Sequence, residues 1–174
     1  MTSVEAGDLV ERIRPLLTTE SEWRMMNSLP LPKSDGGAVL PGVPSSYLEM
    51  LKIADGFICG PVVMFDSSTV ISMQFYAENP EGSSARLTKE EWFCAGVVSD
   101  EPWFINRLDE SIWLFPDTGV EWWMSEQFEE AAPSLKEFLV DVVCGPRYVS
   151  LTGAQEGDQW WRLLERVGRI QEGV

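Results

Sequence analysis

The sequence predicts one α+β domain, in which helices near both ends of the chain flank an antiparallel sheet of about five to six strands. Apolar residues recur at helical spacing toward both ends, and short β-rich runs separated by turns fill the middle. The intervals between these runs are too short for crossover helices, so neighbouring strands should be antiparallel. With 174 residues, 44% of them hydrophobic, the chain is long enough to bury its own core as a single domain.

The N-terminal part is predicted to be helical up to residue 28, with one interruption. Pro15 lacks a backbone N–H and its ring clashes with the preceding turn, so the helix should end or kink there. Thr19 and Glu22 have the spacing of a capping box, which predicts that a second helical segment begins at this point. Residues 28–43 are rich in Pro, Gly and Ser and predict an irregular connection.

Three later segments predict helices that each bury one apolar face. They cover residues 44–54, residues 134–144, where Ser134 and Glu137 form a capping box, and the residues that follow Asp158. The first two helices should cover the same face of the sheet. We therefore expect five of their side chains to be buried together: Tyr47, Leu51, Phe138, Leu139 and Val142.

Six short runs between these helices predict strands, because β-branched and aromatic residues dominate them and turn residues separate them. The runs are Val62–Phe65, Thr69–Phe75, Trp92–Val98, Trp103–Asn106, Ser111–Phe115 and Glu121–Met124. The longest gap, residues 77–91, is polar and predicts a loop.

The residue types argue against several kinds of catalytic and metal site. The chain has no histidine, which removes Ser-His-Asp and Cys-His catalysis and histidine-bound metals. It contains no phosphate-binding loop, no calcium-loop spacing and no G-x-S-x-G motif. We therefore expect a protein that is not an enzyme and needs neither a cofactor nor a metal. Adjacent carboxylates such as Glu90-Glu91 are expected to be solvated surface groups.

Charge and cysteine content indicate where the protein acts and what it binds. With 28 acidic and 13 basic residues the net charge is -15, which disfavours nucleic acid and anionic membranes and favours a basic partner. No apolar run approaches the roughly 20 residues of a membrane span, and no secretory signal is visible at the N-terminus. Cys59, Cys94 and Cys144 are widely spaced and odd in number, so we expect buried free thiols and a cytoplasmic location.

Two features of residues 99–130 suggest a binding surface. The first is a concentration of negative charge: this stretch contains nine acidic residues and only one basic residue, Arg107. The acidic residues are Asp100, Glu101, Asp109, Glu110, Asp117, Glu121, Glu126, Glu129 and Glu130. The second is four tryptophans, a residue type enriched at binding hot spots: Trp103, Trp113, Trp122 and Trp123. Either all four belong to the core, or some of them form an aromatic and acidic face. If residues 121–124 are a regular strand, one of Trp122 and Trp123 points outward.

The helix predicted over residues 44–54 carries a recognisable pattern. Val43–Leu51, followed by Ala54-Asp55-Gly56 and Gly60, resembles the LP-x-x-Y-x-x-F/L…N-G-G segment of SMI1/KNR4-like proteins, the SUKH superfamily. Three further segments are similar to parts of the same family: Trp92–Val98, Ser111–Asp117 and Ser134–Leu139. The resemblance covers about residues 38–145, and residues 146–174 form a C-terminal helical extension outside it.

This resemblance implies a twisted antiparallel sheet flanked by helices and a non-catalytic, protein-binding role. Many bacterial members of the superfamily are immunity proteins that neutralise a toxin, often a nuclease, and the family supplies no catalytic residue to transfer. A general protein-interaction scaffold and a carboxylate-based hydrolase remain as alternatives. The residues expected to contact a basic partner are Asp100, Glu101, Asp109, Glu110, Asp117, Glu121, Trp122 and Trp123.

Overall fold

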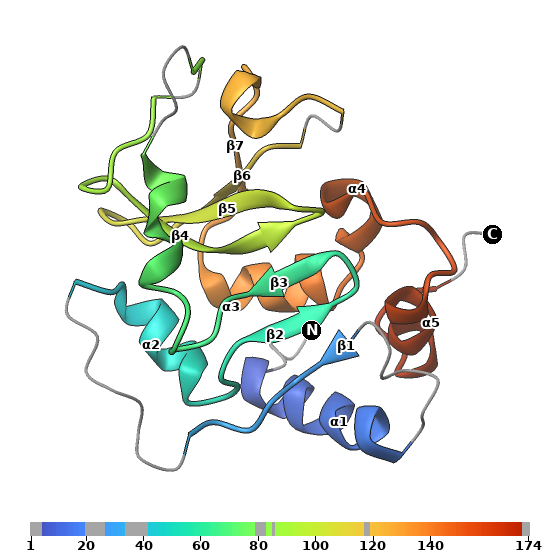
Figure 1. Ribbon diagram of the computed structural model, residues 1–174. Coiled ribbons are helices and arrows are strands. Elements are labelled where there is room, and N and C mark those ends of the chain that lie inside the picture. Colours follow the sequence, from blue (N-terminus) through green and yellow to red (C-terminus); the bar gives the residue numbers. More distant parts are fainter. Residues whose placement is uncertain are drawn as a thin grey trace.

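The computed structural model of this chain describes residues 5–19, 27–33, 42–78, 83–84, 86–116 and 119–171. Within these residues, one antiparallel sheet contains seven strands in the order β1 to β7, so that each strand pairs with the next along the chain (Figure 1). The predicted α+β class and the antiparallel pairing are confirmed. None of the described helices is long and apolar enough to cross a bilayer.

Four strands lie on predicted runs and three do not. The strands are β1 (Asn27–Ser28), β2 (Phe57–Cys59), β3 (Val62–Met64), β4 (Trp92–Val98), β5 (Glu101–Asn106), β6 (Ile112–Leu114) and β7 (Glu129–Ala132). The sequence did not indicate β1, β2 or β7. The first two are only two and three residues long, and β7 reads Glu-Glu-Ala-Ala, a composition with low β-propensity.

Two predicted strands are instead short 3-10 helices. Within Thr69–Phe75, the chain turns and then forms η2 (Ser72–Ala77), because the Asp66 carboxylate accepts hydrogen bonds from the N–H groups of Ser68 and Thr69 at 2.8 and 2.9 Å. Within Glu121–Met124, the chain forms η3 (Trp122–Met124). In both cases, local hydrogen bonds satisfy the backbone groups that a strand would have offered to a neighbour.

Helices form at the three later predicted segments, and the predicted cap at Ser134 is confirmed. They are α1 (Ala6–Thr19), α2 (Ser45–Leu51), α3 (Leu135–Glu137) running into the π-helix η4 (Phe138–Val143), α4 (Tyr148–Thr152) and α5 (Gln159–Arg166). The Ser134 hydroxyl accepts the N–H of Glu137 at 3.2 Å, and the Asp158 carboxylate accepts that of Trp161 at 2.7 Å.

The helical prediction for residues up to 28 needs two corrections. Asn27 and Ser28 form strand β1 and not the end of a helix, because they pair with β2. Helix α1 continues through Pro15 to Thr19, because Leu17 beyond the proline is buried in the core and holds the last turn in place. The predicted capping box ends at Glu22, which lies outside the described residues.

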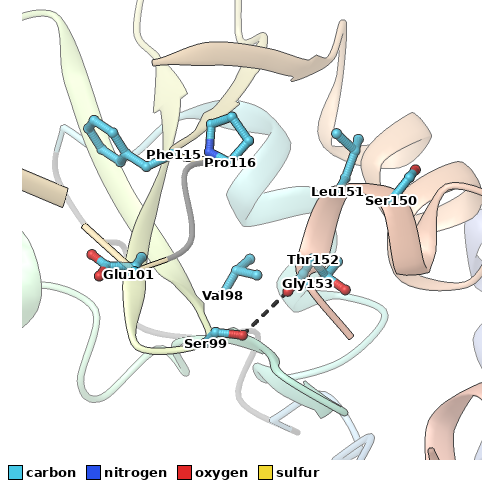
Figure 2. A pocket seen from close by; sticks show the side chains of 10 residues that line it. Val98, Ser99, Glu101, Phe115, Pro116, Ser150, Leu151, Thr152 and Gly153 are labelled. Carbon is cyan, nitrogen blue, oxygen red and sulfur yellow. Dashed lines mark hydrogen bonds between the residues drawn. The ribbon is translucent and has the colours of Figure 1, made fainter. Parts of the chain in front are cut away.

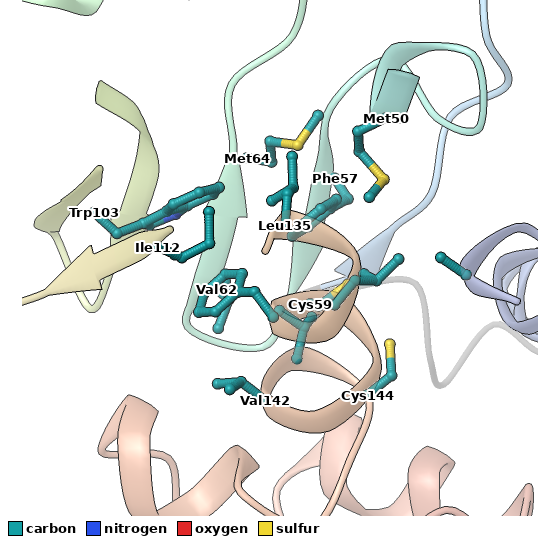
Figure 3. Packing of buried hydrophobic residues seen from close by; sticks show 14 of the residues in the cluster. Met50, Phe57, Cys59, Val62, Met64, Trp103, Ile112, Leu135, Val142 and Cys144 are labelled. Atoms are coloured by element: carbon teal, nitrogen blue, oxygen red, sulfur yellow. The ribbon is translucent and has the colours of Figure 1, made fainter. Parts of the chain in front are cut away.

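The main hydrophobic core lies between one face of the sheet and the helices. Tyr47, Phe138, Leu139 and Val142 are buried in this one cluster, and Leu51 packs against it partly buried, as expected from the apolar stripes. Figure 3 shows side chains from β2, β3, β5 and the α3–η4 helix converging there. The Trp103 ring lies 4.9 Å from that of Phe138, centroid to centroid.

A glycine in β4 makes room for this tryptophan. A β-carbon at Gly96 would lie 2.5 Å from Trp103 Nε1 and 1.9 Å from the carbonyl oxygen of Val63, both far inside contact distance. The β4–β5 register shifts between Cys94 and Gly96, which marks a bulge. The indole N–H of Trp103 can therefore reach across β4 and donate to Val63 O at 3.0 Å.

A second, largely aromatic cluster covers the opposite face of the sheet. Phe104 belongs to it, whereas its neighbours Trp103 and Ile105 belong to the main core, as the alternation of side chains along a strand requires. The other buried members are Ala77, Leu87, Cys94, Phe115 and Trp122. Helices η2 and η3 supply Ala77 and Trp122, so these short elements act as the cover of this second core.

The C-terminal segment is part of the core rather than an appendage to it. The last carbonyl groups of a helix have no partner within the helix, and residues 146–171 satisfy several of those in η4. Trp160 Nε1 donates to Val143 O at 2.7 Å, and Arg169 donates to Cys144 O at 2.9 Å and to Val140 O at 2.7 Å. Trp160 itself is fully buried.

The three cysteines are buried and free, as predicted. Burial raises the pKa of Cys144 to about 12 and also raises the pKa values of Cys59 and Cys94. All three thiols are therefore protonated near neutral pH and pack as small apolar groups.

Candidate binding face

The sheet separates the predicted acidic residues into two groups. Successive turns of an antiparallel meander lie at opposite ends of the sheet, so Asp100 and Glu101 lie at one end of β5 and Asp109 and Glu110 lie beyond the other. A strand of six residues separates such groups by roughly 20 Å. The expected single acidic face is therefore wrong. Asp117 lies outside the described residues.

Glu110 has a structural role. Its carboxylate accepts hydrogen bonds from the N–H groups of Ser45 and Ser46 at 3.0 and 2.9 Å and from the Ser45 hydroxyl at 2.7 Å. These N–H groups begin helix α2, whose N-cap residue is Pro44 and has no side-chain acceptor. Glu110 thus caps α2 from a distant turn, and the prediction that it contacts a partner is replaced by this function.

Replacing Glu110 by alanine should lower the free energy of unfolding by about 1 kcal/mol, the usual cost of losing a helix cap. Partial burial acts to raise the pKa of Glu110, but the hydrogen bonds from Ser45 and Ser46 outweigh it and the pKa is lowered. The stabilisation is therefore complete above the pKa of this group in the unfolded chain and is lost as the pH falls through the lowered folded value.

Urea unfolding at several pH values measures this effect, with Glu126→Ala as the matched control on an exposed glutamate. The difference between the wild type and Glu110→Ala should shrink under acid conditions, while Glu126→Ala should stay close to the wild type throughout. Equal stability of the two variants at neutral pH would show that Glu110 does not cap α2.

Asp109 also has a structural role, because it stabilises the turn in which it lies. Its carboxylate accepts the N–H of Ser111 at 2.9 Å and the Ser111 hydroxyl at 2.6 Å, and these hydrogen bonds lower the pKa of Asp109. The Ser111 hydroxyl in turn accepts the indole N–H of Trp113 at 2.8 Å. This end of the sheet thus uses its carboxylates to hold the β5–β6 turn and the start of α2.

At the other end, carboxylates and exposed apolar side chains lie together. Glu101 Oε2 accepts the N–H of Trp122 at 3.0 Å, which joins the β4–β5 hairpin to η3. The Trp122 ring contacts that of Tyr76 at 6.1 Å, and the Tyr76 ring stacks on that of Phe75 at 4.4 Å, both between centroids. We call this region the acidic end face and define it by Phe75, Tyr76, Asp100, Glu101, Glu121 and Met124.

The exposed apolar residues of the acidic end face are not those that the sequence suggested. Trp122 is only 8% exposed and Trp123 is half-buried against the second cluster, so neither is a free anchor. Phe75 and Met124 are instead 54% and 46% exposed. Sequence reasoning missed Phe75 because it placed that residue in a strand, where an aromatic side chain is unremarkable.

Within the acidic end face, the pKa of Glu101 is raised. Partial burial raises the pKa of Glu101 most, Glu121 and Asp100 raise it further, and the hydrogen bond from Trp122 N–H opposes them. Among the described residues, no lysine or arginine forms an ion pair with any of these three carboxylates. Their mutual repulsion would be relieved by a cation from outside the chain.

The hydrolase alternative requires two carboxylates in one pocket, and Asp55 and Asp66 do line a cavity of about 190 Å³. Both are engaged locally: Asp55 accepts the N–H of Ser67 at 2.9 Å, and Asp66 caps its own turn. Burial acts to raise the pKa of each, but hydrogen bonds from neighbouring Ser and Thr residues lower it. A general acid needs a raised pKa, so this pair does not fit that role.

Comparisons with protein-family models, with curated proteins and with solved structures found no match to this chain. The SMI1/KNR4-like resemblance of residues 38–145 therefore stays a prediction from the sequence. The case for a function rests on the geometry of the acidic end face.

Proposed function

We propose that this chain is a non-catalytic binding module that recognises a basic protein through the acidic end face, and that it neutralises a toxin in this way. The observation that supports the proposal most is a group of three carboxylates, Asp100, Glu101 and Glu121, for which the described residues supply no cation partner. Glu101 is linked through Trp122 and Tyr76 to the exposed ring of Phe75, and Met124 of the same η3 helix is also exposed.

Such a surface combines the two properties that a protein interface needs. The apolar side chains supply contact area that is desolvated on binding, and the surrounding charges steer a basic partner toward it. A chain of net charge -15 attracts such a partner from a distance and repels nucleic acid. A nuclease is basic where it holds phosphates, so an acidic protein can occupy the same groove.

The assignment of a toxin as the partner rests on the SMI1/KNR4-like pattern at Val43–Gly60. In the fold, this pattern covers α2 and β2, which pack into the main core and form part of the scaffold rather than of the acidic end face. The resemblance thus suggests that the partner is a toxin, and the exposed residues suggest that the acidic end face is the surface that binds it.

Affinity capture with the full chain as bait, followed by mass spectrometry and purification of the captured protein, tests the proposal. We expect a basic protein that forms an equimolar complex with this chain, and whose growth inhibition in a host cell is relieved when both are expressed. An acidic or neutral partner would contradict the electrostatic part of the proposal. An equimolar complex without relief of toxicity would instead support the general interaction scaffold.

A further inference from the structure

A cavity of about 310 Å³ lies beside the acidic end face, between the β4–β5 hairpin and helix α4 (Figure 2). Strand and turn residues Val98, Ser99 and Glu101 form one side, and Ser150, Leu151 and Thr152 of α4 form the other. Its volume is at the lower limit of the range of roughly 300–1,000 Å³ that is typical of ligand pockets. It therefore suits a single side chain or a molecule of that size.

Among the described residues, the polar side chains that line this cavity offer only hydrogen-bond acceptors. Each of the three hydroxyl groups donates its proton to a backbone carbonyl. Ser99 donates to Thr152 O at 3.3 Å. Ser150 donates to Arg147 O at 3.2 Å, and Thr152 donates to Tyr148 O at 2.6 Å. An ionised carboxylate has no proton to donate, and among the described residues the carboxylate of Glu101 accepts one hydrogen bond, from Trp122 N–H. The complementary ligand is one that carries donors alone.

Arginine fits this description better than other side chains. Its guanidinium group has five N–H donors in a plane, no acceptor, and a permanent charge. Phe115, Pro116 and Leu151 give the cavity apolar walls against which the planar group and its aliphatic stem can pack. Among the described residues that line it, none is basic, so the carboxylate of Glu101 has no competing cation.

We propose that this cavity binds an arginine side chain of the basic partner, with Glu101 as its ion-pair partner and Ser99 on the same hairpin as a further acceptor. The inference rests on the proposed function for the source of the arginine. Partial burial raises the pKa of Glu101, and the neighbouring Glu121 and Asp100 add to this effect, so an incoming guanidinium also relieves their repulsion.

Binding of N-acetylarginine amide, followed by NMR chemical shifts of the 15N-labelled full chain, tests the inference without the partner. We expect saturable shifts at the amides of residues 98–101 and 150–153. N-acetylcitrulline amide has the same shape without the charge and should bind about tenfold more weakly or not at all. Equal binding of citrulline, or shifts that do not saturate, would overturn the proposal, and equal binding of N-acetyllysine amide would overturn the choice of arginine.

Two variants and a matched control locate the binding. Glu101→Gln keeps an acceptor for Trp122 N–H and should weaken arginine binding about tenfold, while Leu151→Trp should fill the cavity and abolish it. Asp100→Asn removes the same charge from the neighbouring residue, which does not line the cavity, and should change affinity no more than about twofold. If Asp100→Asn matched Glu101→Gln, a diffuse negative field would explain the binding and the pocket would be excluded.

The outcomes also separate this inference from the proposed function. If the arginine probe fails to bind but a basic protein is captured through the acidic end face, the cavity assignment is wrong and the proposed function stands. If the probe binds as expected but no basic protein forms an equimolar complex, the cavity assignment stands and the proposed function is wrong.

Discussion

Replacement of Trp160 by alanine is expected to lower the free energy of unfolding by about 4 kcal/mol, the cost typical of removing a buried tryptophan. The side chain is fully buried, and its indole N–H donates to Val143 O at 2.7 Å at the end of η4. The substitution therefore leaves both a cavity in the main core and a buried carbonyl without its partner. A loss of this size is a large part of the stability of an ordinary domain.

Urea unfolding followed by circular dichroism measures the effect. Arg162→Ala on the exposed side of the same helix is the control and should shift stability by less than about 0.5 kcal/mol. Trp160→Phe keeps most of the apolar volume and loses the hydrogen bond, so it should fall between the two. A loss below about 1 kcal/mol for Trp160→Ala would mean that the segment after residue 145 is dispensable for the fold.

Reversing charge at Asp100 and Glu121 together should slow association with the basic partner about 100-fold at low salt, because steering by complementary charge raises association rates by this order. Both residues are exposed, and no described residue forms an ion pair with either. Asp100 has a positive φ of 72°, which a lysine adopts less readily than an aspartate, so circular dichroism of the variant checks that the fold is kept. Glu110 is left unchanged because its loss would disturb α2 rather than binding.

Stopped-flow measurements at low and high salt test this expectation. The matched control is Glu129→Lys with Glu130→Lys, which changes the net charge equally on the edge strand β7. Added salt should slow the wild type and the control strongly and the Asp100→Lys, Glu121→Lys variant little. Equal slowing by the two double variants would show that net charge alone governs association and that no particular face is used.

The sequence predicted most reliably those features that depend on nearby residues. The cap at Ser134, the helix start after Asp158 and the apolar stripe of residues 134–144 were correct because each involves contacts within one or two helical turns. Strand β7 was not predicted because Glu129 and Glu130 are extended only through their pairing with Leu114 and Trp113 of β6, which are distant in the sequence. The strand expected at Thr69–Phe75 failed because a single side chain, Asp66, offers the backbone a competing turn.

The candidate site was harder to predict because it depends on which turns and short helices, far apart in the sequence, lie next to one another in the fold. The charge pattern included Asp100, Glu101 and Glu121, which belong to the acidic end face, but it also included Glu110, whose carboxylate accepts hydrogen bonds from the start of a helix 64 and 65 positions away in the sequence. The spacing of Trp122 and Trp123 suggested one outward ring, whereas η3 turns Trp122 into the second core. The exposed residue Phe75 comes from a segment that carries no charge signal at all.

Hydrogen–deuterium exchange of the chain, alone and in complex with the captured basic protein, tests the binding face most directly. Binding at the acidic end face should slow exchange of the backbone amides in residues 72–78, 99–101 and 121–124. Residues 45–51 and 107–110, at the opposite end of β5, provide an internal control and should be unchanged. Protection at that opposite end, with none at the β4–β5 hairpin or η3, would contradict the account.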